Sequence, residues 1–281
     1  MAQDEGTARV TGEHDEGGTE GNEAGAAPVA SPVARSREPA VAVEGLTKTV
    51  TVGFRRRKVE ILRGVDLAVR EGEAVGLLGP NGAGKTTTLK VLLGLMRPTT
   101  GAVRLGVEGL HEVGYLPENA YFYDYLTGRE LLGLCSRLFG LKGGEREERI
   151  AGALREVGLQ DAAGKQLRKY SKGMLQRIGI AQALINDPRL VLLDEPMTGL
   201  DPLGRVEVKR IILRLREEGR TVLFSSHILA DVGELCTRAA IMDRGRVVWS
   251  GPVEEAVESG GGSLEDFFVE TVTREPAEVA S

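Results

Sequence analysis

The residues of this chain that are best suited to chemistry stand in a glycine-rich stretch. Residues 79–87 read GPNGAGKTT and follow the apolar run AVGLL at 74–78. Glycines permit tight turns and close backbone approach, so successive N–H groups can converge on phosphate at a helix N-terminus; the pattern predicts a triphosphate site rather than a plain turn. Lys85 would give a charge to the outer phosphates and Thr86 a hydroxyl to Mg²⁺. The loop comprises Gly79, Pro80, Asn81, Gly82, Ala83, Gly84, Lys85, Thr86 and Thr87.

Two carboxylates and a histidine follow other apolar runs. Residues 190–195 read LVLLDE, and His227 comes directly after TVLFSS at 221–226. Parallel strands of one sheet would bring Asp194 near the metal, Glu195 to where water attacks, and the imidazole near the terminal phosphate. Alone, each would be read more simply as a polar strand end or a structural histidine. With the glycine-rich loop in the same chain, they predict a hydrolytic site.

Composition and charge limit the classes of protein that fit. The chain has 281 residues, 41% of them apolar, enough for one substantial core. Residues 1–40 carry a charge of -5 and residues 254–281 carry -7, which leaves +7 for the middle out of a total of -5. A mildly basic middle suits a phosphate ligand. It lacks the concentrated lysine and arginine stripe of a nucleic-acid groove, so we expect no nucleic-acid partner.

Cysteine usage and hydropathy indicate a cytosolic location. Cys135 and Cys236 are far apart and have no metal-binding spacing, so we expect two buried thiols rather than a disulfide or metal site. No segment approaches the length of a membrane span, and the acidic N-terminus does not resemble a secretion signal. We therefore expect a soluble, cytoplasmic chain.

The chain divides into three parts by composition. Residues 1–39 are rich in Ala, Gly, Glu, Pro and Thr, which predicts a disordered acidic tail. Residues 40–253 form the predicted main domain. Residues 254–281 form an acidic extension that we expect to be partly disordered, with a fraying end after three consecutive glycines. The basic run FRRRK at 54–58 is either a solvated hairpin tip or a contact for phosphate or lipid head groups.

Within the main domain, the patterns predict an α/β fold. Short β-prone runs between 41 and 69 indicate an N-terminal antiparallel β subdomain, and later apolar runs alternate with helices, which is typical of a mostly parallel sheet. Residues 119–189 are an inserted all-helical subdomain. Its helices are predicted at 128–139, 145–157 and 172–185, with a capping box at Thr127 and Glu130 and an N-cap at Ser171.

Taken together, these motifs resemble those of the ATP-binding subunits of ATP-binding cassette (ABC) transporters, from about Val41 to about Val272. GPNGAGKTT matches the Walker A motif, GYLPE at 114–118 the Q-loop, YSKGMLQR at 170–177 the signature, LVLLDE the Walker B motif, GLD at 199–201 the D-loop and SSH at 225–227 the switch histidine. Such a set in family order is highly specific. The fold would be that of a P-loop NTPase.

The resemblance implies a role for each site residue. Glu195 would be the general base, His227 the sensor of the γ-phosphate, and Lys85 and Glu118 would also act in catalysis. Thr86, Asp194 and Glu118 would hold Mg²⁺. The groups that face a partner subunit across the shared ATP would be Ser171, Gly173 and Asp201.

The resemblance also implies how the protein works. ATP and Mg²⁺ would be clamped between two ATPase subunits, as a homodimer or a heterodimer, and hydrolysis would drive a separate membrane-spanning permease from the cytoplasmic face. Two alternatives are a cassette protein that acts on ribosomes or nucleic acid and a cassette that only binds nucleotide. The first is disfavoured because the chain has one cassette, and the second because the chain retains Lys85, Asp194, Glu195 and His227.

Three departures from the family pattern stand out. Lys172 and Met174 replace the usual glycine and glutamine of the signature, and Glu118 stands where the Q-loop usually has glutamine. The aromatic residue that usually stacks on adenine would fall near Val50, with Phe54 as a substitute. The signature and Q-loop variants resemble the branch that pairs with separately encoded export permeases.

Aromatic residues gather around the Q-loop. Five of the twelve in the chain fall within eleven residues. Aromatic rings are enriched where protein surfaces meet, so the cluster is either a docking patch for the permease or the packing between the helical subdomain and the sheet. The cluster consists of Tyr115, Tyr121, Phe122, Tyr123 and Tyr125.

Overall fold

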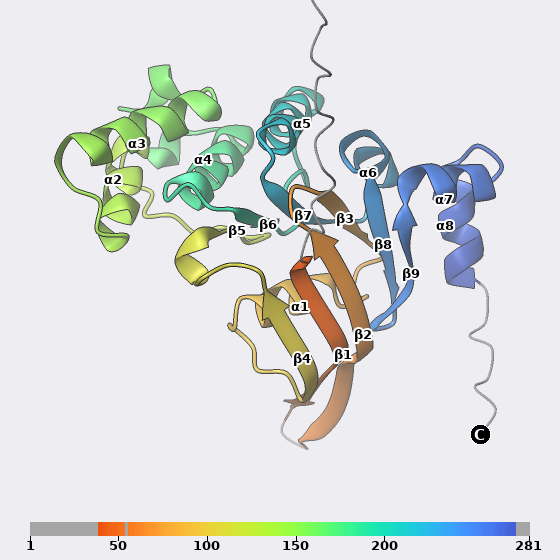
Figure 1. Cartoon of the computed structure of the whole chain (residues 1–281). Helices are drawn as coiled ribbons and strands as arrows, with labels where there is room; N and C mark the ends of the chain where they lie inside the picture. The colour runs from red at the N-terminus through yellow and green to blue at the C-terminus, as the bar shows by residue number, and fades with distance from the viewer. Residues whose placement is uncertain (1–38, 54–55, 274–281) are drawn as a thin grey trace, which may run out of the picture. The chain divides into compact units, whose positions relative to one another are not determined.

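The N-terminal part of the main domain is a three-stranded antiparallel sheet (Figure 1). The computed structural model describes residues 39–53 and 56–273. Strands β1 (Pro39–Val52), β2 (Arg57–Arg70) and β4 (Thr100–Leu105) pair in the order β2-β1-β4. Apolar side chains alternate along β2, which gives the sheet one buried face. Residues 54 and 55 of the basic run FRRRK lie outside the described residues.

The second sheet has six strands in the order β5-β6-β7-β3-β8-β9. Neighbouring strands are parallel except β8 and β9, which are antiparallel. The central strands are buried along their whole length, which is why they read as continuous apolar runs. The strands are β3 (Ala74–Leu78), β5 (Val113–Leu116), β6 (Leu190–Leu193), β7 (Thr221–Ser226), β8 (Arg238–Asp243) and β9 (Arg246–Pro252).

The two faces of this sheet belong to two apolar cores. One face packs with α1 (Lys85–Leu92) and the antiparallel sheet. The opposite face packs with α5 (Pro202–Glu217), α6 (Leu229–Leu235) and the helices of the insertion. Along β6, Leu190 and Leu192 point to the first core while Val191 and Leu193 point to the second. This arrangement confirms the predicted fold class.

The helical subdomain enters after β5 and returns to β6. Its helices are α2 (Gly128–Leu138), α3 (Gly143–Glu156) and α4 (Lys172–Leu184), close to the predicted bounds. The capping box of Thr127 and Glu130 is confirmed, and Ser171 caps α4 by accepting the N–H of Met174 at 3.2 Å. The 3₁₀ turns η2 (Gln160–Ala162) and η3 (Leu167–Lys169) connect α3 to α4, and a further 3₁₀ turn, η1 (Leu110–Glu112), precedes β5.

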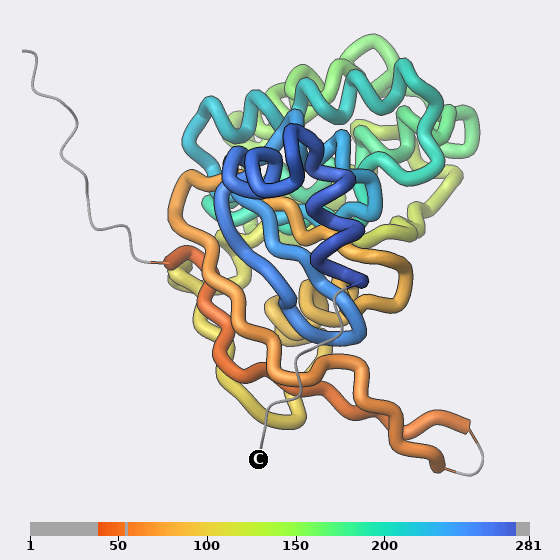
Figure 2. The backbone as a smooth tube through the Cα atoms, turned by 90° about the vertical axis from the view of Figure 1, so that its right-hand side faces the viewer, coloured from red at the N-terminus to blue at the C-terminus, as the bar shows by residue number. Residues whose placement is uncertain are grey.

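The C-terminal region differs from the fraying end expected from its glycines and acids. It forms α7 (Val253–Ser259) and α8 (Leu264–Thr273), which lie beside β8 and β9 (Figure 2). The Phe267 ring meets Trp249 edge-on, with ring centroids 5.1 Å apart, and Leu264 is buried. Burial of an apolar helix face therefore offsets the entropy cost of ordering this segment, although its composition predicted disorder. Of the acidic tail predicted for residues 1–39 and the acidic extension predicted for residues 254–281, residues 1–38 and 274–281 lie outside the described residues.

No helix in the described part of the chain is long and apolar enough to cross a membrane.

Candidate functional site

The glycine-rich loop, residues 79–84, connects β3 to α1 and is called the P-loop below. Gly79 is required because a Cβ atom there would lie 2.3 Å from the Met242 carbonyl oxygen. Gly84 caps α1 in the left-handed region, with φ 108°, and a Cβ there would lie 2.7 Å from Leu62 Cδ2. The glycines therefore let the P-loop lie tightly between β8 and β2. In this position the first N–H groups of α1 point out of the helix, as anion binding requires.

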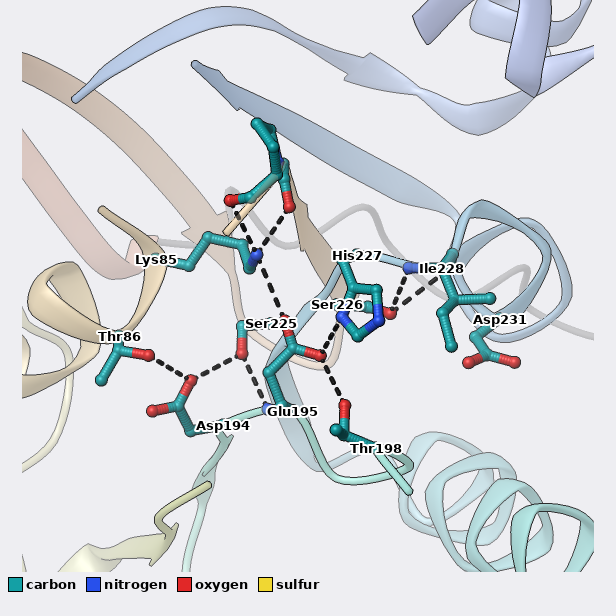
Figure 3. Close-up of polar contacts among 12 residues, drawn as sticks. Lys85, Thr86, Asp194, Glu195, Thr198, Ser225, Ser226, His227, Ile228 and Asp231 are labelled. Atoms are coloured by element: carbon teal, nitrogen blue, oxygen red, sulfur yellow. Dashed lines mark hydrogen bonds and ion pairs between the residues drawn. The ribbon is translucent and has the colours of Figure 1, made fainter. Parts of the chain in front are cut away.

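Lys85, the first residue of α1, is held inside this loop. Its side chain is buried, and Nζ donates to the carbonyl oxygens of Gly79 at 2.6 Å and Pro80 at 3.3 Å. Nζ also lies 3.2 Å from Glu195 Oε1. The ammonium group is thus oriented by the backbone before any phosphate arrives, with one carboxylate as its ion-pair partner (Figure 3).

Asp194 follows β6 and bridges the P-loop helix to β7. Its Oδ1 accepts the hydroxyl of Thr86 at 3.0 Å and that of Ser225 at 2.7 Å. Burial raises the pKa of Asp194, and these two hydrogen bonds oppose that rise. Its second oxygen, Oδ2, is buried and has no hydrogen-bond partner among the described residues. An unpartnered carboxylate oxygen beside a threonine hydroxyl is a donor set that fits Mg²⁺, which keeps several of its own waters.

Glu195 is held by groups from three segments. Its Oε2 accepts the Thr198 hydroxyl at 2.9 Å, and His227 Nδ1 lies 2.8 Å from the same oxygen. Because an ionised carboxylate only accepts, Nδ1 carries the proton and donates it. Burial pushes the pKa of Glu195 up, but Thr198, the charge of Lys85 and His227 outweigh it, and the pKa falls below its ordinary value. The carboxylate is therefore ionised at neutral pH.

The backbone of Glu195 is strained. Its φ of 49° lies in the left-handed region, and its N–H donates to Ser225 Oγ at 2.8 Å. A non-glycine residue in this region is typical of functional sites, where surrounding contacts hold it. Ser225 thus joins both carboxylate residues through one hydroxyl. Sequence analysis assigned no role to Ser225 or Thr198; the position of Ser225 at the end of β7 was the available signal, and Thr198 offered none.

A cavity of about 360 Å³ opens at this edge of the sheet. Glu118 and Glu195 both line it. The apolar side chain that reaches it from the antiparallel sheet is Ile61 of β2, which the sequence did not indicate. Val50 is not among its lining residues, and Phe54 lies outside the described residues. The remaining lining residues are Pro80, Asn81, Gly82, Ala83, Gly84, Lys85, Thr86 and Thr87.

The predicted partner-facing residues lie elsewhere. None of Ser171, Gly173 and Asp201 lines the cavity. Asp201 caps α5 by accepting the Gly204 N–H at 2.9 Å. The starts of α4 and α5 are close together, because a Cβ on Gly173 would lie 3.6 Å from the Cα of Gly204. The structure therefore brings these three residues near one another, but not to the P-loop of their own chain.

The Q-loop aromatics divide into two groups. Tyr121 is 95% exposed, and Tyr123 and Tyr125 are about 60% exposed, at 59% and 60%. Phe122 and Tyr115 instead pack against the two apolar cores. Phe122 and Tyr115 are therefore packing residues, and docking by the three exposed tyrosines stays a prediction.

Helix α6, which follows His227, is tied to α5 by buried ion pairs. Asp231 is fully buried, and its Oδ1 lies 2.7 Å from Arg205 Nη2 and 3.2 Å from Lys209 Nζ. Because Arg205 lies in the first turn of α5, these pairs fix the segment after Glu195 relative to the segment after His227. Removing both Arg205 and Lys209 would leave the buried charge of Asp231 without either of these partners.

A P-loop after β3, two carboxylates after the buried strand β6, and a histidine after β7, the strand between them, define a P-loop nucleotide-binding protein. The family model described as ABC transporter matches residues 62–198. An uncharacterized ABC transporter ATP-binding protein from Synechocystis is 49% identical over 248 residues, covering 83% of this chain and 70% of that protein. The linearmycin resistance ATP-binding protein LnrL from Bacillus subtilis is 34% identical over 213 residues, covering 73% and 68%. The chain belongs to the ABC transporter family of ATP-binding proteins, which confirms the resemblance seen in the sequence.

Solved structures agree with this assignment. The structure of an ATP-binding subunit of an ABC transporter has a TM-score of 0.71 and 32% identity, and covers 83% of this chain and 99% of that one. A dimeric, post-hydrolysis structure of the ATP-binding cassette MJ0796 bound to ADP and Pi has a TM-score of 0.67 and 27% identity, covering 76% and 98%. The chain is thus an ATP-binding subunit whose structural neighbours include dimeric cassettes.

Proposed function

We propose that this chain is the Mg²⁺-dependent ATPase of an exporter, acting as a dimer with a separate membrane permease. The observation that carries this proposal is the Glu195 carboxylate. It is ionised, buried, and held by Thr198, His227 and Lys85 at the carboxyl edge of the sheet. A fixed carboxylate beside a triphosphate loop is what activation of an attacking water requires.

In this proposal, binding of ATP makes Glu195 a stronger base. Lys85 contacts Glu195 Oε1 at 3.2 Å, and phosphate oxygens would compete for the same ammonium group. When Lys85 turns to phosphate, one of the causes that lower the pKa of Glu195 is lost. Glu195 can then accept the proton of the attacking water. His227, whose Nδ1 contacts the carboxylate, keeps it oriented.

We assign Thr86 and Asp194 as the residues that hold Mg²⁺, with Glu118 facing it from the cavity wall. Their oxygens match its preference for hard ligands, and the unpartnered Asp194 Oδ2 offers a site for it or its waters. When bound, the cation neutralises charge on the phosphates. The Thr86–Asp194 hydrogen bond holds the two groups ready at one place.

A second subunit completes the proposed site. Ser171, Gly173 and Asp201 lie away from the cavity of their own chain, so they can contact nucleotide only on another subunit. The N-terminus of α4 offers free N–H groups to an anion there. The partner subunit can be a second copy or a related chain; the proposal holds for both.

We assign the permease contact to the exposed tyrosines and the adjoining groove. The groove has a volume of about 700 Å³ and lies between α2 and α3. Tyr123 and Tyr125 line it together with Arg129, Arg137 and Ile150, which combines aromatic, basic and apolar contacts. The export direction is supported by the similar proteins, one named for linearmycin resistance and another for Nod factor export. The chain's place would then be the cytoplasmic face of the membrane, where ATP is supplied.

The test is the steady-state ATPase rate of Glu195→Gln. The amide keeps the shape of the side chain but cannot take a proton, so we expect the rate to fall by about 10² to 10⁴. Nucleotide binding should be retained. Glu145→Gln, at an exposed position of α3, is the matched control and should hydrolyse ATP as the parent does. An unchanged rate in Glu195→Gln would remove Glu195 from the mechanism.

A further inference from the structure

A further cavity, of about 960 Å³, lies between β9, the edge strand of the six-stranded sheet, and α8. Figure 2 shows α8 beside this strand. The end of β8 and Arg63 of β2 complete its walls, and it shares no lining residue with the nucleotide cavity. Its volume falls within the usual range of small-molecule sites, about 300 to 1,000 Å³. The proposed ATPase does not use this β9–α8 cavity.

One part of the β9–α8 cavity is apolar. Trp249 and Phe267 meet edge-on there, and Val248 and Val272 also line it. Gly251 leaves room for the indole, because a Cβ atom at this position would lie 2.6 Å from Trp249 Cζ2. Val248 is 43% exposed, so apolar surface in the cavity still contacts water. A ligand with an apolar body would gain free energy by covering it.

The charged part of the cavity is mainly basic. Arg63, Arg244 and Arg246 line it, with Asp243 as the one acidic residue among the lining side chains. Arg244 lies 3.6 Å from Asp243 and Arg63 lies 3.7 Å from Glu60, and both arginine side chains are exposed, so these pairs are weak. Arg246 is exposed and has no ion-pair partner in the described part of the chain. An anionic group can therefore bind here without breaking a strong ion pair.

Backbone contacts hold the arginines together before any ligand arrives. Arg244 and Gly245 form the turn between β8 and β9, with φ of 44° and 82°, which is the left-handed geometry of a tight hairpin turn. The N–H of Arg63 donates to the Gly245 carbonyl oxygen at 2.8 Å. Strand β2 is thereby fixed beside the turn, and its arginine lies next to those of the hairpin. Such preorganisation lowers the entropy cost of binding.

We propose that the β9–α8 cavity binds a long-chain carboxylate, a fatty acid anion. Its hydrocarbon chain packs on Trp249 and Val248, and its carboxylate pairs with the arginines. A guanidinium group matches a carboxylate with two parallel hydrogen bonds, which favours this head group over an uncharged one. The site goes beyond the proposed ATPase, because it requires neither nucleotide nor a second subunit.

The experiment titrates the full chain with dodecanoate, below the concentration at which it forms micelles, and follows tryptophan fluorescence. Trp249 is the only tryptophan of the chain, so its emission reports on this cavity. We expect a saturable change in emission. Dodecyltrimethylammonium has the same tail with a cationic head, and acetate has the head without the tail; both should bind at least about tenfold more weakly. Equal binding of the two amphiphiles, or no saturable change, would overturn the proposal.

Two variants at exposed positions of β9 test the two parts of the cavity. Arg246→Glu reverses a charge and Val248→Asp removes an apolar contact, and each should raise the dissociation constant of dodecanoate about tenfold. Arg210→Glu, at an exposed position of α5 outside the cavity, is the control and should bind as the parent does. Circular dichroism checks that each variant folds. Parental affinity in both β9 variants would contradict the assignment.

Two further outcomes are distinguishable. Emission that changes with protein concentration in the absence of dodecanoate would assign the cavity to a second copy of the chain and overturn the proposal. The titration contains no nucleotide, so failure of the proposed ATPase would leave this result unchanged, and failure of dodecanoate binding would leave the ATPase unaffected.

Discussion

The carboxyl edge of the six-stranded sheet and the start of α4 differ in how complete they are. At the sheet edge, Lys85, Asp194 and Glu195 are buried and joined by hydrogen bonds and an ion pair within one chain. At the start of α4, Ser171 is exposed and hydrogen-bonds only within its own helix turn in the described structure. The first region is assembled before nucleotide arrives. The second is an ordered helix start that lies away from the nucleotide cavity of its own chain.

The two regions also differ in how much unfavourable free energy the nucleotide-free chain stores in them. The sheet edge keeps charges out of water and Glu195 at a φ of 49°, which destabilises the nucleotide-free chain locally. The start of α4 is exposed and unstrained. Substitutions at the sheet edge should therefore change the stability and nucleotide binding of the single subunit. Substitutions at the start of α4 should change only the dimerisation of two subunits.

The largest expected effect is that of Gly173→Glu on dimer formation. A carboxylate there would repel the phosphates of a nucleotide on the facing subunit. In the Glu195→Gln background, we expect the ATP-dependent dimer to weaken about 100-fold in analytical ultracentrifugation, with ATP affinity unchanged. The fold should tolerate the change, because the nearest atom to a Cβ at this position is 3.6 Å away.

Gly152→Glu on α3 is the control for this prediction, since the nearest atom to a Cβ there is 4.0 Å away and the position is outside the cavity. Its dimer should equal that of the parent. A Gly173→Glu variant that still dimerises with ATP would show that α4 does not face the second nucleotide.

A smaller effect is expected from Asp194→Asn on the nucleotide-free chain. Burial raises the pKa of Asp194, so the folded state holds its proton more tightly than the unfolded state does. Stability then falls as pH rises through the window above the unfolded pKa, and at neutral pH the buried charge is destabilising. Asparagine removes that charge, and we expect the Tm at pH 7 to rise by about 2 to 4 °C.

Differential scanning fluorimetry from pH 5 to 8 checks this prediction. The gain of Asp194→Asn should shrink as pH falls, because the raised pKa favours protonation of the parent carboxyl and so reduces the buried charge. The contribution of Glu195, whose pKa is lowered, has the opposite sign: it is present above the unfolded pKa and is lost as pH falls. The same variant should lose Mg²⁺-dependent binding of ATP. A gain that does not depend on pH would contradict the role given to the buried charge.

The smallest effect on stability is expected from Tyr121→Ala with Tyr123→Ala. Both side chains are exposed, so the free energy of unfolding should change by less than about 0.5 kcal/mol. We expect the ATPase of the double variant to lose its coupling to the membrane partner, measured as transport per ATP in reconstituted vesicles. Tyr121→Phe with Tyr123→Phe keeps the rings and should remain coupled. Loss of folded protein in the alanine variant would favour packing over docking.

Much of the site was predictable because it depends on strand ends. Apolar runs followed by Lys85, Asp194 and His227 predict a shared sheet edge once the strands are known to be parallel. The contributions of Thr198 and Ile61 were not predictable, because hydroxyl and methyl groups have no distinctive spacing; for Ser225, its place near the end of an apolar strand was the available signal. The helices of residues 253–273 were not predicted for a related reason. The segment is rich in acids and glycines, and its narrow apolar face is stabilising only when it packs against Trp249.

By itself, the sequence determined the family, the P-loop, the fold class and the order of the motifs, because glycines, buried strands and capping residues act through local geometry. Only the tertiary structure decided which side chains form hydrogen bonds and ion pairs with one another. The Ser225 bridge to Asp194 and the contact between Glu195 and His227 both join residues far apart in the chain. Such contacts depend on how separate strands pack, and no local pattern specifies that packing.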